Sequence, residues 1–490
     1  MTKSTSPVVD ALGAWSAGRG PLYLRLAEAV AEAITRGDLL PGSRLPPERA
    51  LADELHISRT TVVLAYQRLR DGGRVESRQG SGTWVRGTGR EAGPSPQEHE
   101  VTSAFRRNVV FRSLFEHTGE AIGMVGAYLP PLPEVEERSR EIAARPLAEL
   151  AATSGYSPLG LPDLRHAVAG MLTRGGLPTR DSEVLITSGA QQAISLVAGL
   201  LVPRGETVAT EDPTYIGAID VFSAAGARVL TVPSGSDGLD PDRLRPVLET
   251  RPRLLYVVPT FHNPTGAIMP ERTRREIARL SEELQVPVVE DLALAGLGLG
   301  REPPPPIAAF ARNAPILTVG SASKTFWSGL RVGWLRGPET LIGRLGRWKA
   351  LADLGSPLQT QAVAAALLAR SAAAEKQRRR ESVARLDLLT SLIKKHLPGW
   401  TWKKPEGGLL LWTRMPAGDA NQLAPIAQRH GVAIVSGSAN SPDHRFADHV
   451  RLPFVAEPAA MTEALQRLGR AWREYQPRAL GPGGSFDVIV

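Results

Sequence analysis

PILTVGSASKTFWSGLRVGW, residues 315–334, holds the features that decide how the larger part of this chain folds. The apolar run of residues 315–320 predicts a short buried strand, and small hydroxyl residues then lie on both sides of Lys324. Burial in a dry pocket lowers the pKa of a lysine amine, which lets the amine form a Schiff base with an aldehyde. The stretch therefore predicts a strand that leads to a reactive lysine, with a lysine and an arginine on a surface loop as the alternative.

The same stretch offers the groups that bind a phosphate monoester. Ser321 and Ser323 supply hydroxyl donors, and Arg331, seven positions after Lys324, supplies a planar cation. An aldehyde and a phosphate occur together on pyridoxal 5′-phosphate. These residues therefore point to that cofactor, and the rest of the chain decides between the cofactor and the surface loop.

The length and composition of the chain restrict its class. Its 490 residues exceed what one hydrophobic core usually spans, so two or more domains are expected. The absence of cysteine excludes disulfides, thiolate metal sites and cysteine nucleophiles, and no metal site is expected. No apolar run reaches about 18 residues, and the N-terminus lacks the apolar core of a signal peptide, so we expect a cytoplasmic location and no membrane partner.

The positive charge of the chain is concentrated near the N-terminus. The formal net charge is +8, and residues 58–90 hold seven arginines against two acidic residues, Asp71 and Glu76. A basic segment of this kind indicates a polyanionic partner.

The N-terminal pattern predicts three helices followed by a hairpin. Apolar residues at helical spacing predict a helix over residues 21–36, and a proline-rich turn leads into a second helix that ends near residue 55. Ser58 is placed to cap a third helix over residues 59–71. Alternation over residues 75–85 predicts a small hairpin. This order of elements is that of a winged helix-turn-helix.

The third helix would present its N-terminal end to base edges in the major groove of double-stranded DNA. Ser58, Arg59, Thr60 and Thr61 lie there. Arg59 could bond guanine in a bidentate contact, and the hydroxyls could bond phosphate. The alternative is a small helical domain with a solvated basic face.

Residues 41–85, PGSRLPPERALADELHISRTTVVLAYQRLRDGGRVESRQGSGTWV, resemble the GntR family of bacterial repressors. The resemblance implies that the chain binds an operator in double-stranded DNA. The DNA contacts that we expect are Arg44, Arg49, Ser58, Arg59, Thr60 and Thr61, with Gln79 and Gly80 in the wing.

Beyond a polar segment rich in glycine and proline, apolar runs alternate with helical patterns. The runs at 184–187, 207–210, 228–232, 254–258, 286–290 and 316–319 predict the strands of an α/β domain with a mostly parallel sheet. Functional residues in such sheets follow the carboxyl ends of strands.

Five loops after these runs carry candidate residues. Ser188, Gly189 and Ala190 open a helix, whose free N–H groups could hold phosphate. Tyr215 could stack on a flat ring, and Asn263 could donate a hydrogen bond. Asp291 could keep a pyridine nitrogen protonated. Lys324 is the fifth. Each feature alone has a structural explanation, such as a small-residue turn or a strand-end acid.

Taken together and in this order, the loops resemble the fold type I enzymes that use pyridoxal phosphate, the aspartate-aminotransferase type. The words "NPTG" at 263–266 and "SASK" with "GLRVG" at 321–333 carry the resemblance. It implies that Lys324 forms the Schiff base, that Asp291 faces the ring nitrogen and Asn263 the ring hydroxyl, and that Tyr215 stacks on the ring. Ser188, Gly189, Ala190, Ser321, Ser323 and Arg331 are implied as the residues around the phosphate.

The resemblance also implies a homodimer and an effector site. Tyr156 resembles a tyrosine that reaches the phosphate of the partner subunit, and Arg451 in "HVRLPF" resembles an arginine that binds a substrate carboxylate. A surface arginine is the alternative for Arg451. In one respect the chain departs from the family, because Leu292-Ala293-Leu294 follows Asp291 where a tyrosine usually touches the ring hydroxyl.

The whole chain resembles the MocR subfamily of GntR regulators, which joins a winged helix to an aminotransferase-like domain. We expect a DNA-binding domain over 1–86, a flexible linker over 87–115, a domain for cofactor, effector and dimerisation over 116–475, and a tail over 476–490.

Three functions fit these domains. The first is a regulator, not an enzyme, in which pyridoxal phosphate, alone or with an amine or amino acid, controls operator binding. The second is an active aminotransferase with a DNA-binding appendage. The third is a plain repressor with an inert second domain, and the intact Lys324, Asp291 and Arg451 count against it.

Overall fold

The computed structural model describes residues 7–12, 15–16, 20–36, 38–39, 42–78, 82–86, 110, 121–145, 154–235 and 238–475. The wing residues Gln79 and Gly80, the expected linker except residue 110, and the expected tail lie outside these ranges. Among the described residues, no helix combines the length and the apolar character that crossing a bilayer requires.

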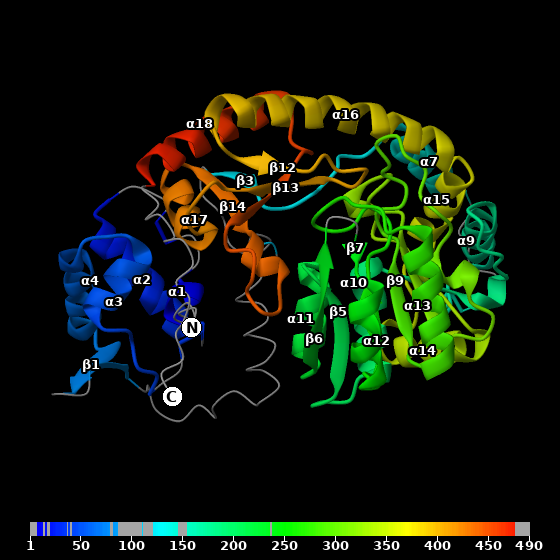
Figure 1. The fold of residues 1–490 in the computed structure, drawn as a ribbon, viewed down its shortest axis with the longest axis horizontal. Helices are drawn as coiled ribbons and strands as arrows, with labels where there is room; N and C mark the ends of the chain where they lie inside the picture. The colour runs from blue at the N-terminus through cyan, green and yellow to red at the C-terminus, as the bar shows by residue number, and fades with distance from the viewer. Residues whose placement is uncertain are drawn as a thin grey trace.

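The N-terminal part folds as the predicted helices and hairpin around a core of its own (Figure 1). Its elements are α1 (Pro7–Ala11), α2 (Leu22–Thr35), α3 (Glu48–Leu55), α4 (Arg59–Asp71), β1 (Val75–Arg78) and β2 (Gly82–Val85). The two strands pair antiparallel. The hydroxyl of Ser58 accepts a hydrogen bond from the Thr61 N–H at 3.1 Å, which confirms the predicted cap of α4. The short helix α1 was not predicted.

A sheet of eight strands forms the centre of the larger part. Its order is β4-β11-β10-β9-β8-β5-β6-β7. The strands are β4 (Val184–Thr187), β5 (Thr207–Asp212), β6 (Arg228–Gly235), β7 (Gly238–Leu239), β8 (Leu255–Val257), β9 (Val288–Asp291), β10 (Ile316–Ser321) and β11 (Gly333–Arg336). β11 pairs antiparallel with β10 and β4, and β7 pairs antiparallel with β6. The other pairs are parallel, so the predicted mostly parallel sheet is confirmed.

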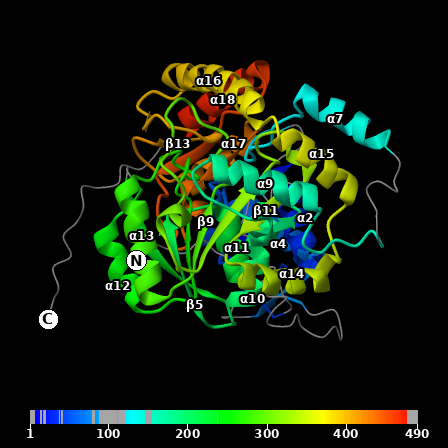
Figure 2. The ribbon, with the colours of Figure 1, turned by 90° about the vertical axis from the view of Figure 1, so that its right-hand side faces the viewer.

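Helices cover both faces of this sheet (Figure 2). They are α9 (Pro162–Arg174), α10 (Ala190–Leu201), α11 (Ile216–Ala224), α12 (Pro241–Glu249), α13 (Glu271–Leu284), α14 (Glu339–Asp353) and α15 (Leu358–Leu368). Val288 packs with α12 and α13 on one face, and its neighbour Val289 packs with α10 and α14 on the other. Because both faces are buried, the strands read as continuous apolar runs rather than as alternating patterns.

A second sheet of five strands, in the order β12-β13-β15-β14-β3, was not predicted. Its strands are β3 (Ile122–Met124), β12 (Thr401–Trp402), β13 (Leu410–Arg414), β14 (Val432–Ser436) and β15 (His449–Pro453). Helices α16 (Ser371–His396), α17 (Ala420–Arg429) and α18 (Pro458–Glu474) pack on it, and α7 (Pro133–Ala143) packs on α15. In Figure 1, α16 runs along the top from the second sheet towards α15.

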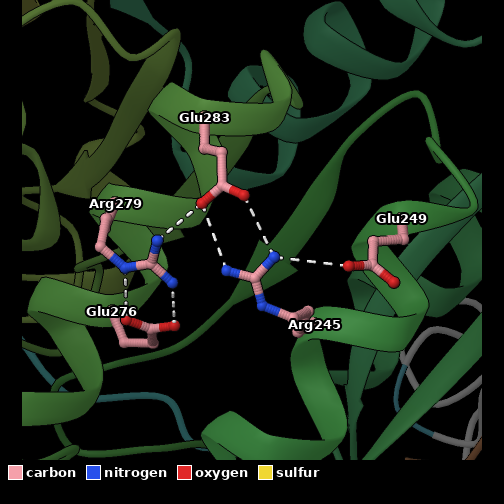
Figure 3. A network of polar contacts seen from close by, with 5 residues as sticks. All are labelled: Arg245, Glu249, Glu276, Arg279 and Glu283. Carbon is pink, nitrogen blue, oxygen red and sulfur yellow. Dashed lines mark hydrogen bonds and ion pairs between the residues drawn. The ribbon is translucent and has the colours of Figure 1, made fainter.

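Charged side chains join α12 to α13 on the surface (Figure 3). Arg245 bonds Glu249 on its own helix and Glu283 on α13, the latter at 3.1 Å. Arg279 bonds Glu283 and Glu276 at 2.6 Å each. The network links α12 to α13, but solvent screens exposed ion pairs, so it stabilises the fold little.

Candidate functional site

The parallel strands of the large sheet place the predicted cofactor residues along one edge. Strands β4, β5, β8, β9 and β10 run in the same direction, so the loops that follow their carboxyl ends meet there. The residues in these loops are Ser188, Gly189 and Ala190 after β4, Tyr215 after β5, Asn263 after β8, Asp291 at the end of β9, and Ser321 and Lys324 at the end of β10. Residues that lie far apart in the sequence thus form one site.

The amine of Lys324 lies at this edge in surroundings that disfavour its charge. Its Nζ donates a hydrogen bond to the carbonyl oxygen of Ala127 at 3.3 Å. Burial lowers the pKa of Lys324 to about 8, and the nearby positive charges of Arg331 and Arg451 act in the same direction. A fraction of the amine is therefore neutral near pH 7, as attack on an aldehyde requires.

The carboxylate of Asp291 is buried and held from two sides. Its Oδ2 accepts a hydrogen bond from the hydroxyl of Tyr256 at 2.7 Å, and its Oδ1 accepts one from the Ala293 N–H at 2.8 Å. Burial raises the pKa of Asp291, and the hydrogen bond from Tyr256 is the foremost interaction that opposes this rise. Sequence analysis missed Tyr256, whose one signal is a lone aromatic ring in the aliphatic run LLYVV.

Gly189 and Arg331 lie together at the start of α10 and form a candidate anion cradle. Gly189 precedes α10 with a φ of 127° and without a side-chain cap, which leaves the first N–H groups of the helix for a ligand. A Cβ atom on Gly189 would lie 2.9 Å from Nη2 of Arg331, so the guanidinium lies against this glycine. Ser323 is buried, and its hydroxyl accepts a hydrogen bond from the Val332 N–H at 3.4 Å, which holds the turn that carries Arg331.

Tyr215 and Asn263 lie at the same edge. The hydroxyl of Tyr215 donates to Oε1 of Gln191 at 3.0 Å, and burial raises the pKa of Tyr215, so the phenol stays protonated. The side-chain oxygen of Asn263 is buried without a hydrogen-bond partner among the described residues. Such a group costs about 1–3 kcal/mol unless a ligand or water satisfies it. The free oxygen therefore fits a ligand hydroxyl, as the ring of pyridoxal phosphate carries.

Arg451 on β15 is a buried cation. It is 4% exposed, its Nη2 donates to the carbonyl oxygen of Val125, and its Nε has no hydrogen-bond partner in the part of the chain that the structure describes. Burial lowers the pKa of Arg451 to about 10, and Tyr215 and Tyr128 are the groups that oppose this shift. Within the described ranges no acidic side chain pairs with Arg451, so the site favours an anionic ligand.

Tyr156, which we expect at the partner subunit's phosphate, is 65% exposed in the loop before α9. Its backbone N–H donates a hydrogen bond to Oγ of Ser154 at 3.4 Å. Its role across a dimer stays a prediction.

The N-terminal end of α4 is open to solvent, as DNA contact requires. Arg59 and Thr60 are exposed, and Nη2 of Arg59 lies 3.6 Å from Oε2 of Glu48. The hydroxyls of Ser58 and Thr61 bond each other at 2.8 Å. Arg49 and Arg44 are also exposed, and the guanidinium of Arg44 lies 5.9 Å from the ring centroid of Trp84.

Two families match separate parts of the chain. Residues 22–85 match the bacterial regulatory proteins of the GntR family, and residues 124–468 match aminotransferase class I and II. YdfD of Bacillus subtilis, named an uncharacterized HTH-type transcriptional regulator, is 31% identical over 94% of this chain and 98% of its own length. The probable rhizopine catabolism regulatory protein MocR of Rhizobium meliloti is 28% identical over 84% of this chain and 85% of its own length.

A similar solved structure is LysN, the α-aminoadipate aminotransferase of Thermus thermophilus, in complex with N-(5′-phosphopyridoxyl)-L-leucine. It is 32% identical with a TM-score of 0.67, and the match covers 74% of this chain and 94% of LysN. The two family matches, the regulators that match almost end to end and the geometry at the sheet edge agree. The chain belongs to the MocR subfamily of GntR regulators, in which a winged helix precedes a domain of the aminotransferase class I and II family.

Proposed function

We propose that this chain is a transcription regulator that binds an operator through α4 and binds pyridoxal 5′-phosphate at the edge of the large sheet to control that binding. One observation carries the proposal, namely that two sites occur in one chain. The winged helix exposes Arg59 at the N-terminal end of α4. The larger domain brings together a lysine of lowered pKa, a buried aspartate and a buried arginine that pairs with no described carboxylate. The domain limits proposed are 1–86, 87–115, 116–475 and 476–490, and the assembly proposed is a homodimer.

The residues present fit the cofactor. When bound, pyridoxal phosphate supplies an aldehyde for an amine and a ring that accepts electrons. The first N–H groups of α10 and the guanidinium of Arg331 would hold its phosphate. Asp291 would hold a proton on the ring nitrogen, and Asn263 would bond the ring hydroxyl.

An effector would act through Arg451. Its guanidinium, which pairs with no carboxylate of the described residues, suits the carboxylate of an amino acid. Arg451 lies on the second sheet, whereas Asp291 lies on the first and Lys324 follows β10 of the first. A ligand that touches both sheets favours the arrangement in which they are closest, and such differential affinity is what shifts a conformational equilibrium. Coupling of about 1–3 kcal/mol between ligand and operator is typical of such linkage.

Footprinting of the DNA next to the gene tests the proposal. The cofactor-free protein, the protein with pyridoxal phosphate and the protein with cofactor and an amino acid should give footprints of different length or affinity. Identical footprints in all three states would leave the larger domain without a regulatory role.

A second candidate function is transamination, because the lysine, the aspartate and the arginine that it needs are all present, and LysN is an aminotransferase. Steady-state conversion of an amino acid and a keto acid measures it directly. Turnover that continues in a variant unable to bind DNA would favour an enzyme with an appended winged helix.

A further inference from the structure

Tyr256 reaches Asp291 because of the register between two neighbouring strands. β8 and β9 run parallel, and Tyr256 lies opposite Val289, two residues before Asp291 on the same face of β9. Side chains in strands lean along the strand, and an aromatic side chain is long enough to meet the diagonal neighbour. The hydroxyl of Tyr256 therefore lies 2.7 Å from Oδ2 of Asp291.

The ring of Tyr256 is fixed in this position. It is fully buried, and the ring of Phe222 packs edge-on against it with centroids 5.9 Å apart. Burial and the charge of Asp291 raise the pKa of Tyr256 well above its ordinary value, so the phenol stays protonated. Tyr256 therefore keeps a proton to donate, and Oδ2 of Asp291 accepts it in this hydrogen bond.

Tyr256 donates a side-chain hydrogen bond to Asp291, which the residues next to Asp291 in the sequence do not. Leu292 and Leu294 are apolar, and this segment contributes only the Ala293 N–H to the carboxylate. A carboxylate has about four acceptor positions, of which these two bonds use two, so a position remains for a ligand N–H. Both bonds favour the ionised form in a site where burial disfavours it.

We propose that Tyr256 is a positioning residue that keeps Asp291 ionised and oriented, so that Asp291 holds a proton on the ring nitrogen of the cofactor. The inference rests on the proposed cofactor site. Without the phenol, the proton would move from the ring nitrogen towards Asp291, because the pKa of the carboxyl would rise. We expect about a tenfold loss of affinity for pyridoxal phosphate, equivalent to about 1.4 kcal/mol.

Tyr256→Phe in the full-length chain tests the proposal, because it removes the hydroxyl and keeps the ring. Binding is measured for pyridoxal phosphate and for 1-deazapyridoxal phosphate, which has a C–H in place of the ring nitrogen. Tyr256→Phe should weaken the first and leave the second unchanged. The control Tyr66→Phe also removes a buried hydroxyl, which bonds the Pro46 carbonyl at 2.9 Å in the winged helix, and should change neither affinity.

The ¹⁵N chemical shift of ring-labelled cofactor reports the proton directly. Tyr256→Phe should move it towards the value of an unprotonated pyridine, a change that loss of packing alone would not cause. Difluorotyrosine at position 256 is a stronger donor of nearly the same shape and should move the shift the other way, which tests the proposal even if Tyr256→Phe folds poorly.

Equal losses for both cofactors, or a ¹⁵N shift that neither substitution moves, would overturn the role of Tyr256 while leaving the cofactor site in place. If the unaltered chain bound neither cofactor, the proposed cofactor site would fall, and this inference with it.

Discussion

Replacing Lys324 with methionine should stabilise the cofactor-free protein, although most substitutions of buried residues destabilise. Burial lowers the pKa of Lys324 from its ordinary 10.5 to about 8, so the folded protein holds a charge that its surroundings disfavour. One pKa unit corresponds to about 1.4 kcal/mol, and the difference therefore amounts to about 3 kcal/mol. Methionine keeps the length of the side chain and removes the charge.

The gain should depend on pH in a defined window. Below about pH 8, Lys324 is protonated in both the folded and the unfolded chain, and the full cost of the buried charge is present. As the pH rises from about 8 towards 10.5, the folded chain loses this proton before the unfolded chain does, so the cost decreases. Lys324→Met should therefore raise the free energy of unfolding by up to about 3 kcal/mol at pH 7, with the advantage fading towards pH 10.5.

Urea denaturation of the cofactor-free protein from pH 6.5 to 10.5, about four units, measures this window. Lys349→Met is the matched control. Lys349 is fully buried, and its Nζ bonds Oδ1 of Asp353 at 2.8 Å. Loss of the amine leaves the carboxylate of Asp353 without its cationic partner, so this variant should be destabilised across the range. A Lys324→Met variant that is less stable than the unaltered chain, or whose gain does not change with pH, would refute the reasoning.

Three further predictions concern the ligands. Arg59→Ala should weaken binding to a selected operator by about 1–3 kcal/mol, whereas Arg49→Ala should weaken binding to all DNA sequences evenly. Competition with random DNA distinguishes the two effects, and an unchanged operator affinity in Arg59→Ala would contradict the placement of α4 in the major groove. Gly189→Ala should lower the affinity for pyridoxal phosphate and for inorganic phosphate, because its Cβ would lie 2.9 Å from Nη2 of Arg331; calorimetry measures both, and undiminished phosphate binding would show that the cradle lies elsewhere. Arg451→Ala should remove the response of operator binding to amines that carry a carboxylate and keep the response to the cofactor alone, and a retained response to amino acids would assign the carboxylate to another group.

Local patterns in the sequence were sufficient to predict much of the fold and several residues of the candidate site. Apolar spacing and the Ser58 cap predicted α2 and α4, because a helix depends on residues a few positions apart. Apolar runs followed by polar loops predicted the large sheet and its functional edge, since carboxyl ends of parallel strands meet. Asn263, Asp291 and Lys324 could thus be named before the fold was known, and the structure brings them to one edge.

Contacts between distant residues were decided by the tertiary structure alone. β3 at residues 122–124 joins β14 at 432–434, a pairing that no local pattern encodes. The bond between Tyr256 and Asp291 depends on the register of β8 against β9, and in the sequence Tyr256 is only one more apolar residue of a buried strand. The resemblance named Arg451, but only packing determines that no carboxylate of the described residues pairs with it, because burial and charge pairing depend on which chain segments the fold brings together.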